Sequence, residues 1–62
     1  MPLIHARIVS GRDQEKIEKL ALTLSEAAAR VLEIPEERVH VVIEETNPDR
    51  WSVGGVMKSS PS

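Results

Sequence analysis

The sequence predicts a small α+β protein with one β-α-β unit, parallel strands and a short C-terminal hairpin. Three observations lead to this fold class. The chain has 62 residues, which is room for a single domain, residues 1–62. Two segments of alternating apolar residues flank one long amphipathic segment. Gly54-Gly55 follows them and is typical of a tight hairpin turn. Strands joined through a helix pair in parallel with a right-handed crossover.

The first strand is expected over residues 2–9, "PLIHARIV". Apolar residues occupy every second position, which is the pattern of a strand with one covered face. The covered face would carry Ile4, Ala6 and Ile8, and the other face Leu3, His5, Arg7 and Val9. Pro2 suits the start of a strand because it has no N–H to donate to a ladder.

The helix is expected to begin after the turn "SGR" at 10–12 and to run to residue 32. Asp13 is a good N-cap, and Glu15 lies near the positive end of the helix dipole. Apolar residues recur at helical spacing from Ile17 onward, and Pro35 stops the helix. The charged face of this helix is interpreted as solvated; it carries Glu15, Lys16, Glu18, Lys19 and Arg30.

The second strand is expected over residues 38–45, "RVHVVIEE", which is rich in β-branched residues. Arg38 and His40 would then share one strand face. Val39, Val41 and Ile43 would form the opposite, covered face. The turn "NPDR" at 47–50 and the hairpin "WSVGGV" follow, and residues 58–62 are expected to be a flexible tail.

Chain length and composition together predict an oligomer. A chain this short buries only about 60% of its unfolded surface. It has no cysteine, so disulfides cannot compensate. One helix covers one face of a two-stranded sheet. A neighbouring subunit is therefore expected to cover the other face, which bears Leu3, Val9 and Val42.

Charge and hydropathy exclude several classes of function and partner. The net charge is −2 and the basic residues are scattered, so no nucleic-acid or membrane-surface partner is expected. No apolar run approaches the ~18 residues of a membrane span, and the N-terminus lacks signal-peptide features. We therefore expect a cytoplasmic protein. With two histidines and no cysteine, we expect neither a metal site nor a cofactor.

Pro2 is the first candidate for chemistry. If Met1 is removed, Pro2 carries a free secondary amine that its ring holds in place. An α-amino group has a reference pKa of about 7.7–8.0, and a low-dielectric pocket lowers that pKa toward the value of a useful general base. The alternative reading is ordinary N-terminal processing at a strand edge.

Three further side chains have both a functional and a structural interpretation. Arg12, at the carboxyl end of the first strand, could grip a carboxylate with a bidentate fork, or it could be a solvated turn residue. Trp51 is the only aromatic residue and could be a pocket wall or a packing anchor. His40 could act in catalysis or form hydrogen bonds at a subunit interface.

Taken together, "MP" at the start, "SGR" at 10–12, the β-α-β pattern and "WSVGG" resemble the tautomerase superfamily, especially the small 4-oxalocrotonate tautomerase group. The similarity covers residues 2–55. It implies a dimer-based hexamer, removal of Met1, and Pro2 as general base in moving a proton between carbons of a small unsaturated 2-oxo acid. It also implies that Arg12 binds the distal carboxylate from an adjacent subunit and that Trp51 belongs to an apolar wall.

His40 departs from the resemblance, because well-behaved members carry an arginine there that binds the 2-oxo carboxylate end. Arg38 is a candidate substitute for binding this end. Four readings stay open: a homohexameric tautomerase with altered substrate preference, one chain of a heterohexamer, a proline-dependent dehalogenase or decarboxylase, and a catalytically silent assembly protein. The third would need a carboxylate to activate water, for which Glu44 and Glu45 are available by type.

Overall fold

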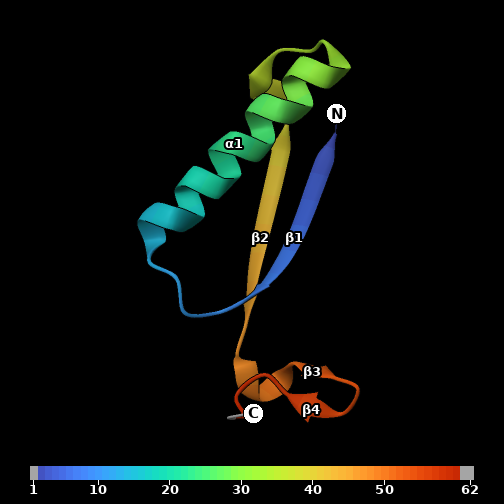
Figure 1. Cartoon of the computed structure of the whole chain (residues 1–62). Coiled ribbons are helices and arrows are strands. Elements are labelled where there is room, and N and C mark those ends of the chain that lie inside the picture. Colours follow the sequence, from blue (N-terminus) through green and yellow to red (C-terminus); the bar gives the residue numbers. More distant parts are fainter. Residues whose placement is uncertain (1, 61–62) are drawn as a thin grey trace.

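The computed structural model describes residues 2–60 and has the predicted β-α-β order (Figure 1). The elements are β1 (Leu3–Val9), α1 (Gln14–Leu32), the 3₁₀ turn η1 (Glu36–Arg38), β2 (His40–Thr46), the 3₁₀ turn η2 (Pro48–Arg50), β3 (Ser52–Val53) and β4 (Val56–Met57). Helix α1 lies across one face of the β1–β2 sheet, and the β3–β4 hairpin lies beyond the carboxyl ends of those strands. The α+β prediction is confirmed.

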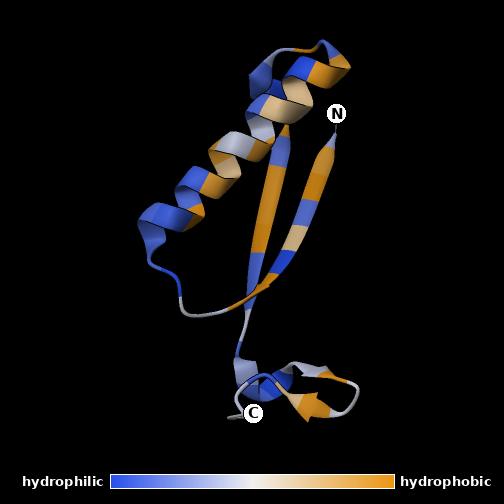
Figure 2. Cartoon of the chain, in the orientation of Figure 1, coloured by the Kyte–Doolittle hydropathy of each residue, from blue (hydrophilic) through white to orange (hydrophobic). Residues whose placement is uncertain are grey.

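Strands β1 and β2 are parallel, with pairs running from Leu3↔His40 to Val9↔Thr46. Covered and uncovered positions alternate over residues 3–8 in β1 and over residues 40–44 in β2, as the apolar pattern predicts. In Figure 2, hydrophobic and hydrophilic residues alternate along β1, whereas the middle of β2 is hydrophobic throughout. Of residues 2–60, only Val39 is buried, with 9% of its surface exposed. The core between α1 and the sheet is therefore thin.

Helix α1 begins at the predicted cap. The Asp13 carboxylate accepts a hydrogen bond from the Lys16 backbone N–H at 2.9 Å, which satisfies one of the free donors of the first turn. At the other end, Glu33 adopts a left-handed conformation with φ 56°, and the Ile34 N–H donates to the Ala29 carbonyl at 3.1 Å. The helix ends at Leu32, as predicted, and the left-handed turn at Glu33 ends it before the chain reaches Pro35.

Strand β2 begins at His40, two residues later than the sequence pattern suggested. The Arg38 N–H donates to the Pro35 carbonyl, and the Val39 N–H donates to Glu36, both at 3.0 Å. These donors are used inside η1 and cannot join the ladder. The expectation that Arg38 and His40 share a strand face is therefore wrong.

The C-terminal hairpin forms around Gly54-Gly55 as predicted, with Ser52 paired to Met57 and Val53 to Val56. Both glycines have positive φ, 60° and 85°, which this kind of two-residue turn requires. Within the described residues, the hairpin forms its own two-stranded sheet and does not join β1–β2. Of the expected tail, the backbone up to Ser60 is hydrogen bonded to the hairpin, and residues 61–62 lie outside the described residues.

The single chain is open and leaves much apolar surface uncovered. Its accessible surface is 4951 Å², whereas a folded monomer of 6.9 kDa is expected to expose about 4000 Å². Its radius of gyration is 14.6 Å, compared with about 10.5 Å for a compact chain of this length. Large apolar residues that stay exposed are Leu3, Leu22, Val31, Leu32, Val42, Val53 and Val56. No helix among residues 2–60 has the length and apolar character needed to cross a membrane.

Candidate functional site

Pro2 and His40 lie side by side at the amino edge of the sheet. The His40 backbone N–H donates to the Pro2 carbonyl at 3.0 Å, directly before the Leu3↔His40 pair. Pro2 is half-buried and His40 is exposed. The parallel arrangement produces this proximity, because the amino ends of parallel strands meet at one edge. The expected removal of Met1 concerns a residue outside those described.

Arg38 lies at the end of η1, just before this edge, and is exposed. Within residues 2–60, neither its side chain nor that of His40 makes a hydrogen bond or an ion pair. Both side chains therefore keep their donors for a ligand or a neighbouring molecule. Arg38 and His40 do not share a strand face, because Arg38 lies in η1 and β2 begins at His40. They are nonetheless only two residues apart in the chain.

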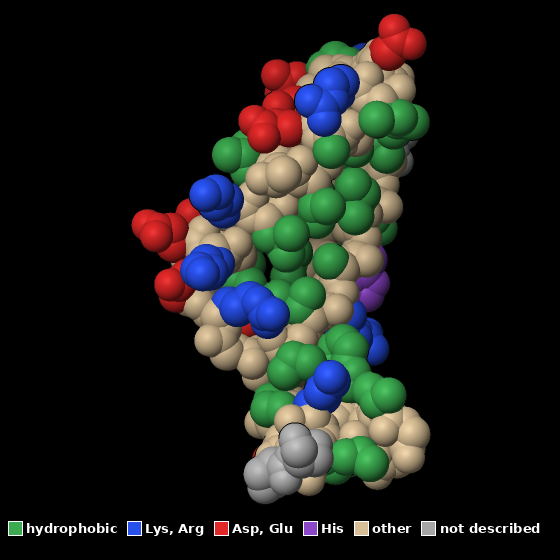
Figure 3. Space-filling model, in the orientation of Figure 1, with side chains coloured by type: hydrophobic (Ala, Val, Ile, Leu, Met, Phe, Trp, Pro, Cys, Tyr) green, Lys and Arg blue, Asp and Glu red, His purple; other side chains and the backbone are tan. Residues whose placement is uncertain are grey.

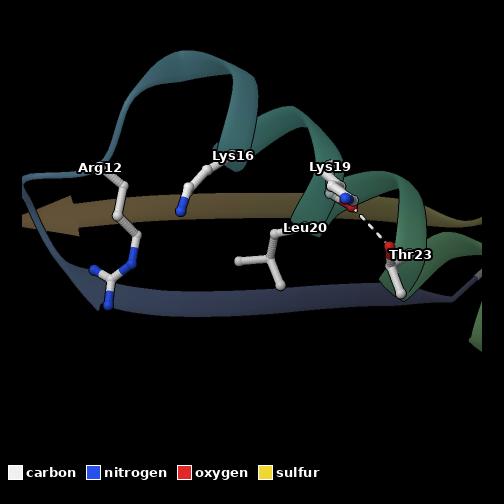
Figure 4. A pocket seen from close by; sticks show the side chains of 5 residues that line it. All are labelled: Arg12, Lys16, Lys19, Leu20 and Thr23. Carbon is white, nitrogen blue, oxygen red and sulfur yellow. Dashed lines mark hydrogen bonds between the residues drawn. The ribbon is translucent and has the colours of Figure 1, made fainter.

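Arg12 lies at the opposite, carboxyl edge. Gly11 has φ 131°, a backbone conformation that suits glycine, and it turns the chain from β1 toward α1. One Arg12 N–H donates to the Val9 carbonyl at 2.8 Å, which fixes the guanidinium and leaves its other donors free. Arg12 lines an open cavity of about 440 Å³ with Lys16, Lys19, Leu20 and Thr23 (Figure 4).

Trp51 is half-buried and follows η2 at the same carboxyl side of the sheet. The turn before it is fixed by the Asn47 side chain, which accepts a hydrogen bond from the Asp49 N–H at 2.8 Å. Trp51 lines a second cavity, of about 300 Å³, with Arg7, Thr46, Arg50 and Ser52. The sequence pattern does not single out the two arginines of this cavity. The available signal was that Arg50 directly precedes Trp51 in the chain.

The predicted site residues thus fall into two groups at opposite ends of one strand. Pro2 and His40 are at the amino edge, and Arg12 and Trp51 are at the carboxyl side. The seven residues of β1 that separate Pro2 from the turn before Arg12 span about 23 Å. A small ligand cannot contact Pro2 and Arg12 of the same chain, so contact with both would require two chains.

A charged cluster occupies the uncovered face of the sheet. The Glu44 carboxylate pairs with His5 Nε2 on one oxygen and with Arg7 Nη2 at 3.4 Å on the other. The charge of Arg7, followed by the hydrogen bond and the charge of His5, lowers the pKa of Glu44 from its ordinary value. Glu44 is therefore held as an ionised carboxylate in this cluster. The described residues contain no group of three or more His, Asp or Glu side chains placed to hold a metal ion.

The fold and these residues define the class of protein. A β-α-β unit with a proline at its amino edge and an arginine at its carboxyl edge is what the tautomerase resemblance implies. The family model described as "Tautomerase enzyme" matches residues 2–60. The chain belongs to the Tautomerase family.

Known relatives agree with this assignment. A "probable tautomerase" from Lactiplantibacillus plantarum is 37% identical over 59 residues, covering 95% of this chain and 92% of the relative. The crystal structure of TomN, a 4-oxalocrotonate tautomerase homologue in the tomaymycin biosynthetic pathway, matches with a TM-score of 0.90 and 40% identity over 94% of this chain and 89% of TomN. A heterohexamer 4-oxalocrotonate tautomerase from Chloroflexus aurantiacus matches with a TM-score of 0.91 and 36% identity over 95% of both chains.

Proposed function

We propose that this protein is a 4-oxalocrotonate tautomerase-like isomerase that uses the Pro2 amine, freed by removal of Met1, as its general base. The reaction moves a proton between positions of a small unsaturated 2-oxo acid through a dienol. The proton passes from the substrate to the Pro2 nitrogen and returns to a different carbon. The observation that carries this proposal is the match to the tautomerase family from residue 2 onward, with Pro2 at the strand edge beside His40.

Pro2 suits this role for two physical reasons. Its ring limits motion of the nitrogen, and its carbonyl is tied to the His40 N–H, so the base has a defined position. Apolar neighbours such as Leu3, with 65% of its surface exposed on a lone chain, are available to be covered by a second chain. Such burial disfavours the ammonium form and keeps the amine able to accept a proton near neutral pH.

The substrate is bound at both ends by basic side chains in this proposal. Arg12 of one chain binds the distal carboxylate, and the amino edge of another chain contributes Pro2. His40, assisted by Arg38, binds the 2-oxo carboxylate end. Supporting this assignment, Arg12 keeps free donors and the His40 and Arg38 side chains have no partner within residues 2–60. Trp51 contributes an apolar wall that limits water near the reacting carbons.

The assembly that fits these requirements is a homohexamer built from dimers. The thin core, the open shape and the exposed apolar residues all favour burial between chains. The separation of Pro2 from Arg12 makes a one-chain site impossible for a small substrate.

The proposed mechanism is tested by assaying 2-hydroxymuconate and phenylenolpyruvate with the wild type and Pro2→Ala. Intact mass must first establish that Met1 is absent, because an amide nitrogen cannot serve as the base. We expect Pro2→Ala to lose about 10²-fold or more in kcat/KM while the oligomer persists. Unchanged activity in a Met1-free, assembled Pro2→Ala protein would rule out the proline mechanism.

A heterohexamer is the second candidate, and one specific comparison favours it. The Chloroflexus aurantiacus relative is described as a heterohexamer, and His40 lacks the permanent charge and fork of the arginine expected there. A partner chain would supply the arginine. Purification from the native source would then recover a second small chain in equal amount, and the isolated chain would gain activity on adding it.

The other readings have less support. A dehalogenase or decarboxylase needs a carboxylate to activate water, and Glu44 is already paired with His5 and Arg7. Glu45 makes no such pair within residues 2–60, but it lies toward the carboxyl end of β2, far from Pro2. A catalytically silent assembly protein would be indicated by retention of Met1 in the cell.

A further inference from the structure

The pocket beside Arg12 carries more positive charge than one carboxylate requires. Three of the chain's eight Lys and Arg residues line it: Arg12, Lys16 and Lys19. None of the chain's ten Asp and Glu residues lines this pocket, although the chain as a whole is acidic. Charge of one sign is therefore concentrated here, on a surface whose net charge has the opposite sign.

The helix places these residues together by its periodicity. Lys16, Lys19, Leu20 and Thr23 are spaced i, i+3, i+4 and i+7, so they share one face of α1. The turn after β1 brings Arg12 to this face. Figure 4 shows the Arg12 and Lys16 side chains directed into the same space, with Leu20 beside them. Figure 3 shows basic side chains gathered along this part of the surface, next to hydrophobic side chains.

Within residues 2–60, the three cations of the pocket are not engaged in ion pairs with a carboxylate, although acidic side chains lie beside them on the same surface (Figure 3). Glu18, which lies on the same helix, instead accepts a hydrogen bond from Gln14 at 3.2 Å. Arg12 is held by its bond to the Val9 carbonyl, so part of the cost of ordering it is already met. Leu20 supplies an apolar surface next to the charges.

We propose that Arg12, Lys16 and Lys19 together bind a doubly negative end of the substrate, either a phosphate monoester or a pair of neighbouring carboxylates. This inference rests on the proposed function, because it assigns the distal end of the same substrate. Arg12 alone matches one carboxylate in a bidentate fork. The two lysines add mobile point charges, which suit a more highly charged group. A cavity of about 440 Å³ is large enough for such a group with a short carbon chain.

Direct binding tests this site without relying on turnover. Phosphate at about pH 8, where it is mainly a dianion, malonate and acetate are titrated at matched ionic strength and followed by backbone amide NMR. We expect phosphate or malonate, but not acetate, to shift the signals of residues 12–23. The Lys16→Gln/Lys19→Gln double variant should weaken that binding about tenfold. The control Arg30→Gln/Lys58→Gln removes the same charge elsewhere and should bind like the wild type.

Inhibition then links the site to the substrate. The preferred dianion should inhibit turnover of 2-hydroxymuconate, which has a distal carboxylate, competitively in the wild type, and about tenfold less in the lysine variant, which keeps Pro2. Phosphate and malonate distinguish the two chemical sources of the double charge. Equal binding by the lysine variant and the wild type would overturn the proposal, as would dianion binding without competition. If no enol acid is turned over at all, the proposed function fails, and the titration still decides whether the anion site exists.

Discussion

In the proposed function, His40 sets how this chain binds the 2-oxo end of a substrate. Its backbone is tied to Pro2, so its side chain starts from a fixed point at the proposed site. The resemblance to the tautomerases places an arginine there, with a permanent charge and two parallel donors. A histidine supplies one ring N–H in a given direction and is charged only when protonated.

Replacing His40 with arginine is therefore expected to raise kcat/KM for 2-hydroxymuconate by about 10- to 100-fold, the value of a charge-assisted hydrogen bond in the transition state. The measurement is steady-state turnover of Met1-free protein. His40→Lys is the matched control, because it adds charge without a fork and should gain less. No gain with arginine would mean that His40 does not limit this substrate.

Glu44 gives the uncovered sheet face a dependence on pH. Arg7 and then His5 lower its pKa below the ordinary value of 4.5. A carboxyl group with a lowered pKa in the folded state stabilises the fold above the unfolded pKa. That contribution is lost as the pH falls through the lowered value. The effect is small because the side chain is exposed.

Glu44→Gln is accordingly expected to lower Tm at about pH 7. The difference from the wild type should shrink below pH 4.5 and disappear as the pH falls through the lowered pKa of Glu44. Thermal unfolding at one protomer concentration measures it. Glu45→Gln, which removes a charge without an ion pair among residues 2–60, should show a smaller difference at neutral pH. A difference for Glu44→Gln that is constant with pH would contradict the assignment.

At the scale of elements, the end of α1 stores strain. Glu33 adopts φ 56° and ψ 49°, a region that costs a residue with a Cβ about 1–2 kcal/mol and costs glycine little. The turn is nonetheless needed, because it lets the Ile34 N–H bond back to Ala29 before Pro35 leads into η1.

Glu33→Gly should therefore raise the free energy of unfolding by about 0.5–1 kcal/mol, after allowing for the greater freedom of glycine in the unfolded chain. Denaturant unfolding at fixed protomer concentration measures this change. Glu33→Ala removes the same side chain but keeps the Cβ, and it should give no gain. Destabilisation by glycine would show that the left-handed turn is not strained.

The elements differ in how well the sequence predicts them. Helix α1 is predictable because Asp13 caps it and its apolar spacing continues to Leu32. The strand faces follow from period-two alternation. The first residue of β2 cannot be predicted from this alternation, because Arg38 fits the pattern as well as His40 does. Arg38 is excluded from β2 only by the backbone hydrogen bonds of η1, which form after Pro35. The turn at Glu33 also gives no signal, since glycine or asparagine is the usual residue there.

The candidate site is only partly predictable for a similar reason. Pro2, Arg12 and Trp51 stand out by residue type and position in the chain. Lys16 and Lys19 fit a solvated helix face equally well, and their spacing becomes informative only once Arg12 is known to lie against them. The turn at η2 brings Trp51 to a cavity shared with Arg7 of β1, and the sequence does not specify the path of that turn.

The whole chain has the family's fold, but in the proposed function one copy holds only part of the site. Its exposed apolar residues and its radius of gyration of 14.6 Å favour assembly, and β1 keeps Pro2 about 23 Å from the turn before Arg12. The proposed working site joins Pro2 of one chain to Arg12 of another. Light scattering should give a mass of six times 6.9 kDa for the active species.

The most direct measurement is subunit complementation. Pro2→Ala and Arg12→Ala chains are made separately, then unfolded, mixed in equal amounts and reassembled, and turnover of 2-hydroxymuconate is measured. Each variant alone should be nearly inactive. In the mixture, roughly a quarter of the sites should be active, because they take Pro2 from an Arg12→Ala chain and Arg12 from a Pro2→Ala chain. A mixture that stays inactive, while wild type treated in the same way recovers its activity, would contradict a site shared between chains.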